Sequence, residues 1–230
     1  MPLPALPPRT LRSRSQRING LAGFTLIEMA VALVVVALLL GSLLAPLSSQ
    51  VEQRKISEAQ KILEQINDAL MGFAMSQTPA RLPCPDTDIP ADGLENTPCV
   101  AASIEGAVPW ATLGVPATDP WGQLYRYRVT GTFAAGPILL TSTGNLRVCT
   151  INTCGAGTLV ATNVPAVVFS TGPVVVRVVP SPDEVENTNN NADFVSRTFS
   201  SVAGSEFDDV VTWISDKVLL NRLVAAGKLP

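Results

Sequence analysis

The stretch Gly23-Phe24-Thr25-Leu26-Ile27-Glu28 opens a run of nineteen further residues, Met29 to Leu47, in which only Ser42 carries a polar side chain. From Phe24 to Leu47 the segment has twenty-four residues. As a helix it exceeds the roughly 20 residues that the hydrocarbon core of a bilayer requires. The sequence therefore predicts a membrane-spanning helix over 24–47.

The residues before this helix predict its orientation. No acidic residue precedes Glu28, whereas the basic residues there are Arg9, Arg12, Arg14 and Arg17. By the positive-inside rule, the N-terminus lies in the cytoplasm and the rest of the chain on the other side of the membrane. A carboxylate inside a membrane helix costs about 2.5–3.5 kcal/mol on insertion scales. Glu28 is therefore expected to have a partner or a functional role.

This junction resembles the N-terminal signal of type IV prepilins and of the pseudopilins of type II secretion. That signal has a short basic leader, a Gly, a Phe that becomes the new N-terminus, Thr-Leu-Ile-Glu and a long apolar run. The resemblance implies that a prepilin peptidase removes residues 1–23 by cutting after Gly23 and then methylates the amine of Phe24. It also implies that Glu28 pairs with the N-terminal amine of a neighbouring subunit. The implied partners are the peptidase, other pilin or pseudopilin subunits and an inner-membrane assembly platform.

Two other kinds of N-terminal segment fit less well. A secretory signal peptide has an apolar region of about 7–15 residues and an Ala-x-Ala-like cleavage site, whereas the apolar run here is longer. An ordinary single-span anchor leaves the acidic Glu28 beside the Gly-Phe junction unexplained.

Composition narrows the functional class. Of the 230 residues, the part after the span is long enough for one further domain. Loss of the leader removes four arginines and no acids, so the formal charge moves from −3 to −7. An acidic chain without a basic tail does not suggest nucleic acid as a partner. There is no histidine, so His-dependent catalytic arrangements and His-ligated metals are excluded, and we expect no enzymatic activity.

Four cysteines follow the span, at positions 84, 99, 149 and 154. An even number of cysteines in a periplasmic domain favours disulfides, and proximity in sequence suggests Cys84–Cys99 and Cys149–Cys154. Sequence alone allows three pairings. A zinc site is less favoured because the spacings are not those of paired C-x2-C knuckles, and free thiols are the remaining alternative.

Residues 48–77 are predicted to continue the helix into water. Apolar residues recur there at alternating intervals of three and four, which makes one apolar stripe on a polar helix. These residues are Ile56, Ala59, Leu63, Ile66, Leu70 and Phe73. The stripe requires a surface to pack on. The predicted fold class is therefore α+β and type IV pilin-like, with a long N-terminal helix packed on a small antiparallel sheet in a β-rich head, residues 78–230.

Within the head, residues 79–107 are predicted to be a loop region because prolines at positions 83, 85, 90 and 98 interrupt it. Its carboxylates resemble a calcium loop only loosely, so a solvated acidic loop held by a disulfide is the preferred interpretation. They are Asp86, Asp88, Asp92 and Glu95.

Beyond this loop, β-branched and aromatic runs predict a meander of four or five antiparallel strands. The runs are 124–129, 137–143, 158–164, 166–169 and 174–179. Residues 181–193 are predicted to form a surface loop, and 208–228 a short helix or an extended segment that docks on the sheet.

Three segments of the head resemble the major pseudopilin of type II secretion. They are Asp119-Pro120-Trp121-Gly122, Phe169-Ser170-Thr171-Gly172-Pro173 and Asp208-Asp209-Val210-Val211-Thr212-Trp213. By this resemblance Asp208 and Asp209 are candidate calcium ligands. Val174 stands where the family has a further aspartate, and a long insertion separates the last two segments. The alternative is an exposed acidic pair at a helix N-terminus.

The sequence thus predicts a structural, non-enzymatic subunit of a type IV filament, either a type II secretion pseudopilus or a pilus, and the insertion suggests a minor or specialised subunit. It is expected to be a single-pass inner-membrane protein with a periplasmic head until it assembles. The alternative is a single-span, membrane-anchored periplasmic binding or receptor protein that holds a ligand in its disulfide loops.

Overall fold

The computed structural model describes residues 23–99, 101, 103–155, 157–173 and 180–229. For residues 40–49 and 103 it describes the backbone alone. The chain divides into two compact units, Met1–Ser48 and Ser49–Pro230. The second half of the N-terminal helix therefore belongs to the same unit as the head.

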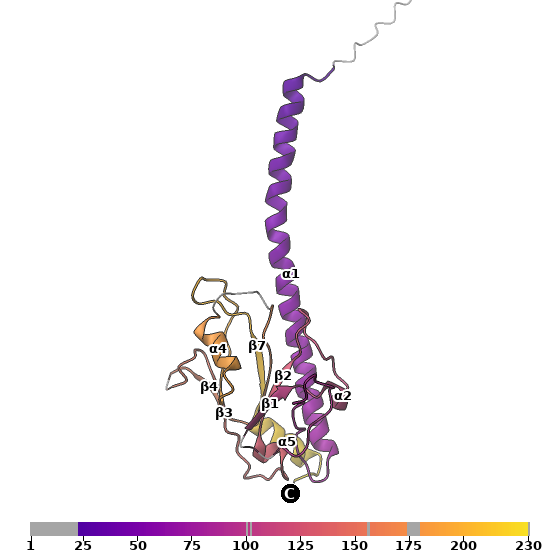
Figure 1. Cartoon of the computed structure of the whole chain (residues 1–230), viewed down its shortest axis with the longest axis vertical. Coiled ribbons are helices and arrows are strands. Elements are labelled where there is room, and N and C mark those ends of the chain that lie inside the picture. Colours follow the sequence, from indigo (N-terminus) through magenta and orange to yellow (C-terminus); the bar gives the residue numbers. More distant parts are fainter. Residues whose placement is uncertain (1–22, 100, 102, 156, 174–179, 230) are drawn as a thin grey trace, which may run out of the picture. The chain divides into compact units, whose positions relative to one another are not determined.

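Helix α1 runs from Leu26 to Ser76 (Figure 1). In the second half of α1 the predicted apolar stripe is confirmed for Ala59, Leu63, Ile66 and Leu70, which are buried in the main core, whereas Phe73 is half-buried and lies outside this core. Ile56 packs against this core as a partly buried side chain. Packing of this stripe, more than helix propensity, stabilises the second half of α1.

Within the part of the chain that the structure describes, no helix combines the length and the apolar character needed to cross a bilayer. The side chains of 40–47, which belong to the span predicted from the sequence, lie outside the described residues. The membrane span over 24–47 thus stays a prediction.

The stripe of α1 packs on a four-stranded antiparallel sheet with the order β1-β2-β5-β7. These strands are β1 (Ser103–Ala107), β2 (Arg126–Thr130), β5 (Ala166–Ser170) and β7 (Val210–Ile214). Successive side chains of β2 point to opposite faces of the sheet, and the two faces differ in character. Tyr127 and Val129 enter the core beneath α1, whereas Arg126 and Arg128 both pair with Glu105 of β1.

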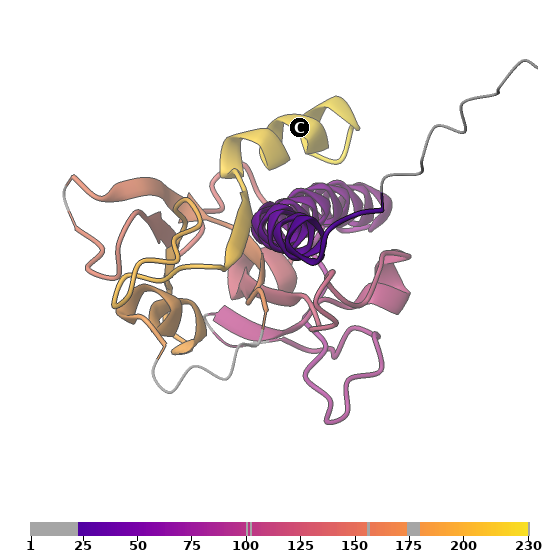
Figure 2. The same ribbon diagram turned by 90° about the horizontal axis from the view of Figure 1, so that it is seen from above.

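A second, three-stranded sheet has the order β4-β3-β6. It consists of β3 (Leu146–Cys149), β4 (Leu159–Val164) and β6 (Asp193–Val195), and β6 runs parallel to β3. A smaller core joins it to the first sheet, with the rings of Phe169 and Phe194 5.5 Å apart. In Figures 1 and 2 the second sheet lies on the side of β7 away from the second half of α1.

Four short helices complete the fold described here. They are α2 (Trp110–Leu113), α3 (Gly131–Ala134), α4 (Pro182–Thr188) and α5 (Asp216–Ala225). The class expected from the sequence, a mixture of helices and antiparallel sheet after an N-terminal helix, is confirmed.

The prediction of a single meander is wrong, because the strands form two sheets. Residues 137–143 are not a strand: Ile138 enters the main core while Leu139 and Leu140 face solvent in a turn. Strand β1 lies within the region predicted to be loop, and residues 174–179 are outside the described residues.

The prediction of a loop over 181–193 is also wrong. Helix α4 lies there, with Pro182 in its first turn and a capping box in which Ser181 and Glu184 satisfy each other's backbone amides. Its sequence signal, Ser-x-x-Glu with Pro at the first helical position, was present in the chain.

Candidate functional site: the N-terminal signal and the polar centres of the head

Residues Gly23, Phe24 and Thr25 precede the first turn of α1 in non-helical conformation. The Phe24 side chain is 82% exposed. A Cβ placed on Gly23 would meet no atom within 4 Å outside its immediate neighbours. The peptide bond between Gly23 and Phe24 is therefore open to another protein.

Glu28 forms a capping box with Thr25 at the start of α1. Its Oε2 accepts hydrogen bonds from the Thr25 amide at 2.9 Å and from the Thr25 hydroxyl at 3.0 Å. The Glu28 amide in turn donates to Thr25 Oγ1 at 3.3 Å. These contacts satisfy amides that the first turn of a helix leaves without intrahelical partners. Glu28 thus has a local partner within its own chain, and the Thr-x-x-Glu spacing was the signal for it.

Residues 19–44 match the family described as the prokaryotic N-terminal methylation motif. The chain carries the prepilin-type cleavage and methylation signal. This signal suggests a type IV pilin-like or pseudopilin-like precursor, and it implies processing by a prepilin peptidase and assembly with other pilin-type subunits. No curated protein and no solved structure gives a significant match.

The prepilin signal covers the junction 23–28 and most of the apolar run, and the match ends before the head begins. The predicted leader, residues 1–23, lies outside the described residues except for Gly23. The remaining candidate residues belong to the head, where burial and hydrogen bonding define their roles.

The disulfide Cys84–Cys99, with Cα atoms 5.8 Å apart, closes the acidic loop as expected. Inside it, carboxylate oxygens of Asp86, Asp88 and Asp92 lie within 4.8 Å of one another. Each of these carboxylates already accepts hydrogen bonds within the loop: buried Asp86 accepts from the backbone amides of Asp88 and Gly93, Asp88 from the side chain of Asn96, and Asp92 from the backbone amide of Leu94. The carboxylates therefore act as turn-forming acceptors within the loop.

Glu95, the fourth acid of this loop, does not join the other three. It forms a bidentate pair with Arg81, with two N–O distances of 2.7 Å, and accepts from the Cys84 amide. Burial disfavours the charged carboxylate, but the hydrogen bonds from Arg81 and Cys84 outweigh it and leave the pKa of Glu95 below its ordinary 4.5. Arg81 also lies over the Phe73 ring at 5.3 Å, so the pair ties the loop to α1.

The disulfide Cys149–Cys154, with Cα atoms 5.5 Å apart, is likewise present with the expected partners. It closes the start of the connection between β3 and β4. No cysteine is left free.

Asp208 and Asp209 are buried and lead into strand β7, so the alternative of an exposed pair at a helix N-terminus is wrong. Helix α5 begins only at Asp216. Asp209 Oδ2 accepts a hydrogen bond from the side-chain Nδ2 of Asn187 at 2.7 Å. The same side chain donates to the carbonyl oxygen of Val195 and accepts from its backbone amide. This buried amide joins α4, β6 and the residue before β7.

The turn after β5 packs against Asp208. Gly172 has a φ of +65°, and a Cβ there would lie 2.6 Å from the carbonyl oxygen of Asp208. The structure thus brings together two of the three pseudopilin-like segments. Calcium prefers six or more oxygen ligands, and among the described residues no third acidic side chain joins Asp208 and Asp209 at ligand distance. Val174 lies outside the described residues, so calcium at this pair stays a prediction.

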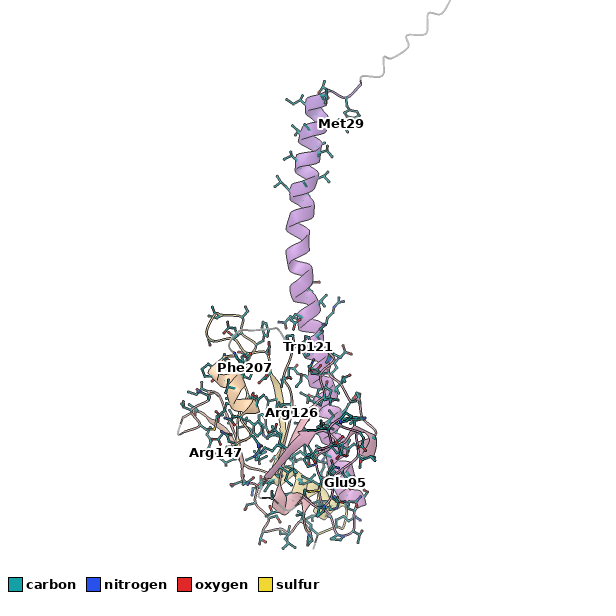
Figure 3. The ribbon with its side chains drawn as sticks, viewed as in Figure 1. Met29, Glu95, Trp121, Arg126, Arg147 and Phe207 are labelled. Atoms are coloured by element: carbon teal, nitrogen blue, oxygen red, sulfur yellow. A yellow bond between two sulfur atoms is a disulfide. The ribbon has the colours of Figure 1, made fainter. Side chains whose placement is uncertain are left out.

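Asp119 is buried and accepts hydrogen bonds from three other residues, a role that the sequence did not predict. Its Oδ1 accepts from the amides of Trp121 and Gln123, and its Oδ2 accepts from the hydroxyl of Ser170 at 2.5 Å. The Trp121 ring nitrogen donates to Glu52 of α1 at 3.1 Å, and Figure 3 shows Trp121 beside that helix. The first pseudopilin-like segment is therefore fixed both to the second one and to α1. The only local signal was an Asp at the first position of the turn Asp119–Gly122, where such residues are common.

A groove of about 710 Å³ lies in the second unit, between α1 and strand β7. Its lining mixes apolar side chains such as Ile56 and Val211 with polar ones such as Gln60, Glu64 and Arg197. Neither disulfide loop contributes to its lining. The groove can hold a small ligand or a segment of a partner, and it is the feature that favours a binding function for the head.

Proposed function

We propose that this chain is a structural, non-enzymatic subunit of a type IV filament. The observation that carries the proposal is the match of residues 19–44 to the methylation motif, with Gly23, Phe24 and Glu28 in their places. In this proposal a prepilin peptidase cuts after Gly23 and methylates the amine of Phe24. The processed subunit then joins other pilin-type subunits through bundling of α1.

The exposed first turn of α1 supports this role. Phe24 and the apolar side chains after it are mostly exposed in a single chain, including Leu26, Ile27, Leu33 and Leu38. A continuous apolar helix surface requires lipid or other helices to cover it. Bundling supplies other helices, and the amine of a neighbouring Phe24 supplies Glu28 with an ionic partner whose attraction strengthens in an apolar medium.

The proposed location is the inner membrane, with a single pass, a cytoplasmic N-terminus and a periplasmic head until assembly. The arginines of the leader and the two disulfides support it. The pseudopilin-like segments, two of which meet at Gly172 and Asp208, favour a type II secretion pseudopilus over a pilus. The long insertion between them favours a minor or specialised subunit.

Analysis of the mature N-terminus tests the proposal. Mass spectrometry of the chain isolated from membranes is expected to find a first residue Phe24 with a methylated amine, and loss of the peptidase is expected to restore residues 1–23. A mature chain that begins after Ser48 or Ser49, as a signal-peptidase product would, contradicts it.

A second candidate, a membrane-anchored periplasmic binding protein, is favoured by the groove beside α1. It predicts that Glu28→Ala leaves function intact, whereas the filament proposal predicts loss of assembly with the chain still in the membrane.

Calcium at Asp208 and Asp209 is a subsidiary proposal for the head. Thermal unfolding of the full chain in detergent is expected to show a higher midpoint with calcium than with a chelator, and equal midpoints contradict it. Asp209→Asn is expected to remove the difference.

A further inference from the structure

Three basic side chains on α1 have no partner in the structure. Four of the 16 basic residues lie in the leader, and Arg177 lies outside the described residues. Among the basic residues that the structure describes, only Arg54, Lys55 and Lys61 form neither an ion pair nor a side-chain hydrogen bond. All the others have such a contact: Arg81, Arg126, Arg128, Arg147, Arg197, Lys217, Arg222 and Lys228. The unpaired cations of the described chain therefore lie together on one segment of α1.

Arg54 and Lys55 are the first basic residues after the predicted membrane span. Arg54 follows Leu47 by seven positions, which corresponds to about 10 Å of helix rise. The Cα–Cβ bonds of an α-helix tilt toward its N-terminus, which here is the end that carries the span. Lipid headgroups extend about 5–8 Å beyond the hydrocarbon core, so the long side chains of Arg54 and Lys55 reach them while the stems lie along the helix.

The neighbouring residues of α1 suit a bilayer surface. Val51 lies one turn nearer the span, on the same face of the helix as Arg54 and Lys55, and is 52% exposed. The acid in this turn, Glu52, accepts a hydrogen bond from the ring nitrogen of Trp121 at 3.1 Å and is held toward the head. An exposed apolar residue with cations beyond it is typical of a helix at a membrane interface.

We propose that Arg54 and Lys55 bind the phosphate groups of anionic phospholipids at the periplasmic surface of the inner membrane. The inference rests on the membrane location proposed above and adds a lipid contact that lies outside the prepilin signal. Guanidinium and ammonium groups are common ligands of phosphate in proteins, and a guanidinium binds two of its oxygens at once. The contact fixes the depth of α1 and must break when the subunit leaves the membrane for a filament.

Charge and position favour lipid over a second copy of the chain as the occupant. The processed chain has a formal charge of −7, so an anionic membrane surface repels most of the head and attracts its unpaired cations. Lipid headgroups lie beside Arg54 and Lys55 in every subunit that is inserted in the membrane, whereas a second copy reaches them only after assembly.

Lys61 provides a comparison within the same helix. It is exposed and unpaired, and it lies on the same face as Arg54 but seven positions farther from the span, which adds about 10 Å. Glu58 and Glu64 lie three residues to either side of it. Attraction to a charged surface decays over a Debye length of about 8 Å at physiological ionic strength, so Lys61 is expected to contribute little.

The lipid affinity of the full chain tests the proposal. The chain is isolated from membranes in a neutral detergent and titrated with phosphatidylglycerol or with phosphatidylcholine. Native mass spectrometry measures the dissociation constant of the first bound lipid and resolves chains with and without the leader, so that chains with the same N-terminus are compared. We expect phosphatidylglycerol to bind more tightly. Arg54→Gln and Lys55→Gln are each expected to weaken its binding about fivefold, which is the contribution of one cation near a lipid surface.

Two substitutions are matched controls. Lys61→Gln removes the same kind of charge farther from the span and is expected to change the affinity by less than about twofold. Arg54→Lys keeps the charge and is expected to retain most of the affinity. Intact disulfides and an unchanged melting midpoint verify the fold of each variant.

Equal affinity for the two lipids, unchanged affinity in the Arg54→Gln and Lys55→Gln variants, or an equally large effect of Lys61→Gln overturns the proposal. Inorganic phosphate that displaces the lipid, where chloride at the same ionic strength does not, would identify a site for free phosphate instead. A dimer that forms without lipid and requires Arg54 would identify a second copy as the partner. Either result also overturns the lipid contact.

Flotation with vesicles in high salt separates this inference from the proposed function, because insertion of a span does not depend on salt. A chain that floats but shows no preference for phosphatidylglycerol contradicts the lipid contact alone. A chain that does not float contradicts the membrane location and the lipid contact together.

Discussion

The first turn of α1 and the head satisfy their acidic groups in opposite ways. Glu28 is exposed and bonds to Thr25, three residues away. Asp119 and Asp209 are buried and bond to Ser170 and Asn187, 51 and 22 residues away. A local arrangement can be recognised as a short motif, whereas a long-range one exists only after the chain has folded. The local arrangement at Glu28 lies within residues 19–44, which match a known family, whereas Asp119 and Asp209 lie outside that match.

Because the first turn of α1 and the head use different contacts, substitutions in the two regions are expected to have different consequences. Changes in the first turn are expected to alter processing or assembly and to leave the stability of the head unchanged. Changes at the buried junctions are expected to do the reverse.

The largest effect, on filament assembly, is expected from substitution of Glu28. Glu28→Gln keeps a side chain that can complete the capping box but removes the charge that would pair with a neighbouring amine. We expect loss of assembled filaments, measured by electron microscopy and by sedimentation of sheared material, with the chain still processed at Gly23. Filaments at the normal level would place the role of Glu28 in the helix cap alone and would contradict a role of its charge in assembly.

A large effect confined to stability is expected at Gly172. Both Gly172 and Gly122 have positive φ, +65° and +86°, but only at Gly172 does a Cβ meet other atoms, at 2.6 Å from the Asp208 carbonyl oxygen. Gly172→Ala should therefore lower the free energy of unfolding by about 1–3 kcal/mol more than Gly122→Ala, because the backbone before β7 must move. Urea unfolding of the full chain in detergent measures the difference. Equal losses would mean that backbone strain alone matters and that the turn is not packed against Asp208.

Features that depend on contacts between residues close in sequence could be predicted from the sequence, whereas features that depend on long-range contacts could not. The stripe from Ile56 to Leu70 and the junction at Gly23 follow from spacing along the chain, and proximity in sequence favoured the disulfide pairings that the structure has among the three possible ones. The capping boxes at Thr25 and Ser181 were equally local and were overlooked.

Other features had no local signal. Strands β4 and β5 are separated in sequence only by Pro165 but belong to different sheets, and the parallel pairing of β3 with β6 joins residues 46 positions apart. Asp119 resembles any aspartate in a turn until Ser170 reaches it. Residues 137–143 have the composition of a strand, but the burial of Ile138 against the core beneath α1 outweighs that propensity.

A smaller, pH-dependent effect is expected at Glu95. Because its folded pKa is lowered, the pair with Arg81 contributes stability above the ordinary pKa of 4.5 and loses it as the pH falls through the lowered value. Glu95→Gln should cost about 1 kcal/mol of unfolding free energy at neutral pH, and the difference from wild type should vanish in acid.

The matched control for Glu95 is Asp193→Asn, which breaks the similarly bidentate but more exposed pair with Arg147. Its effect at neutral pH should be smaller, because solvent screens exposed pairs. A Glu95→Gln effect that persists unchanged in acid would show that shape, and not ionisation, ties the acidic loop to α1.

The smallest effect is expected at Thr25, and it separates the two roles of Glu28. Thr25→Ala removes the cap and should destabilise the first turn by about 1 kcal/mol, which faster amide exchange at Ile27 and Glu28 in detergent would reveal. Thr25→Ser retains the hydroxyl and is expected to exchange like the wild type. Both variants keep the Glu28 side chain, so filaments should still assemble and the head should melt at its usual midpoint. Since Glu28→Gln removes the charge and keeps the cap, opposite outcomes for these two substitutions would assign assembly to the charge. Loss of filaments in Thr25→Ala would instead make the local cap a precondition of assembly.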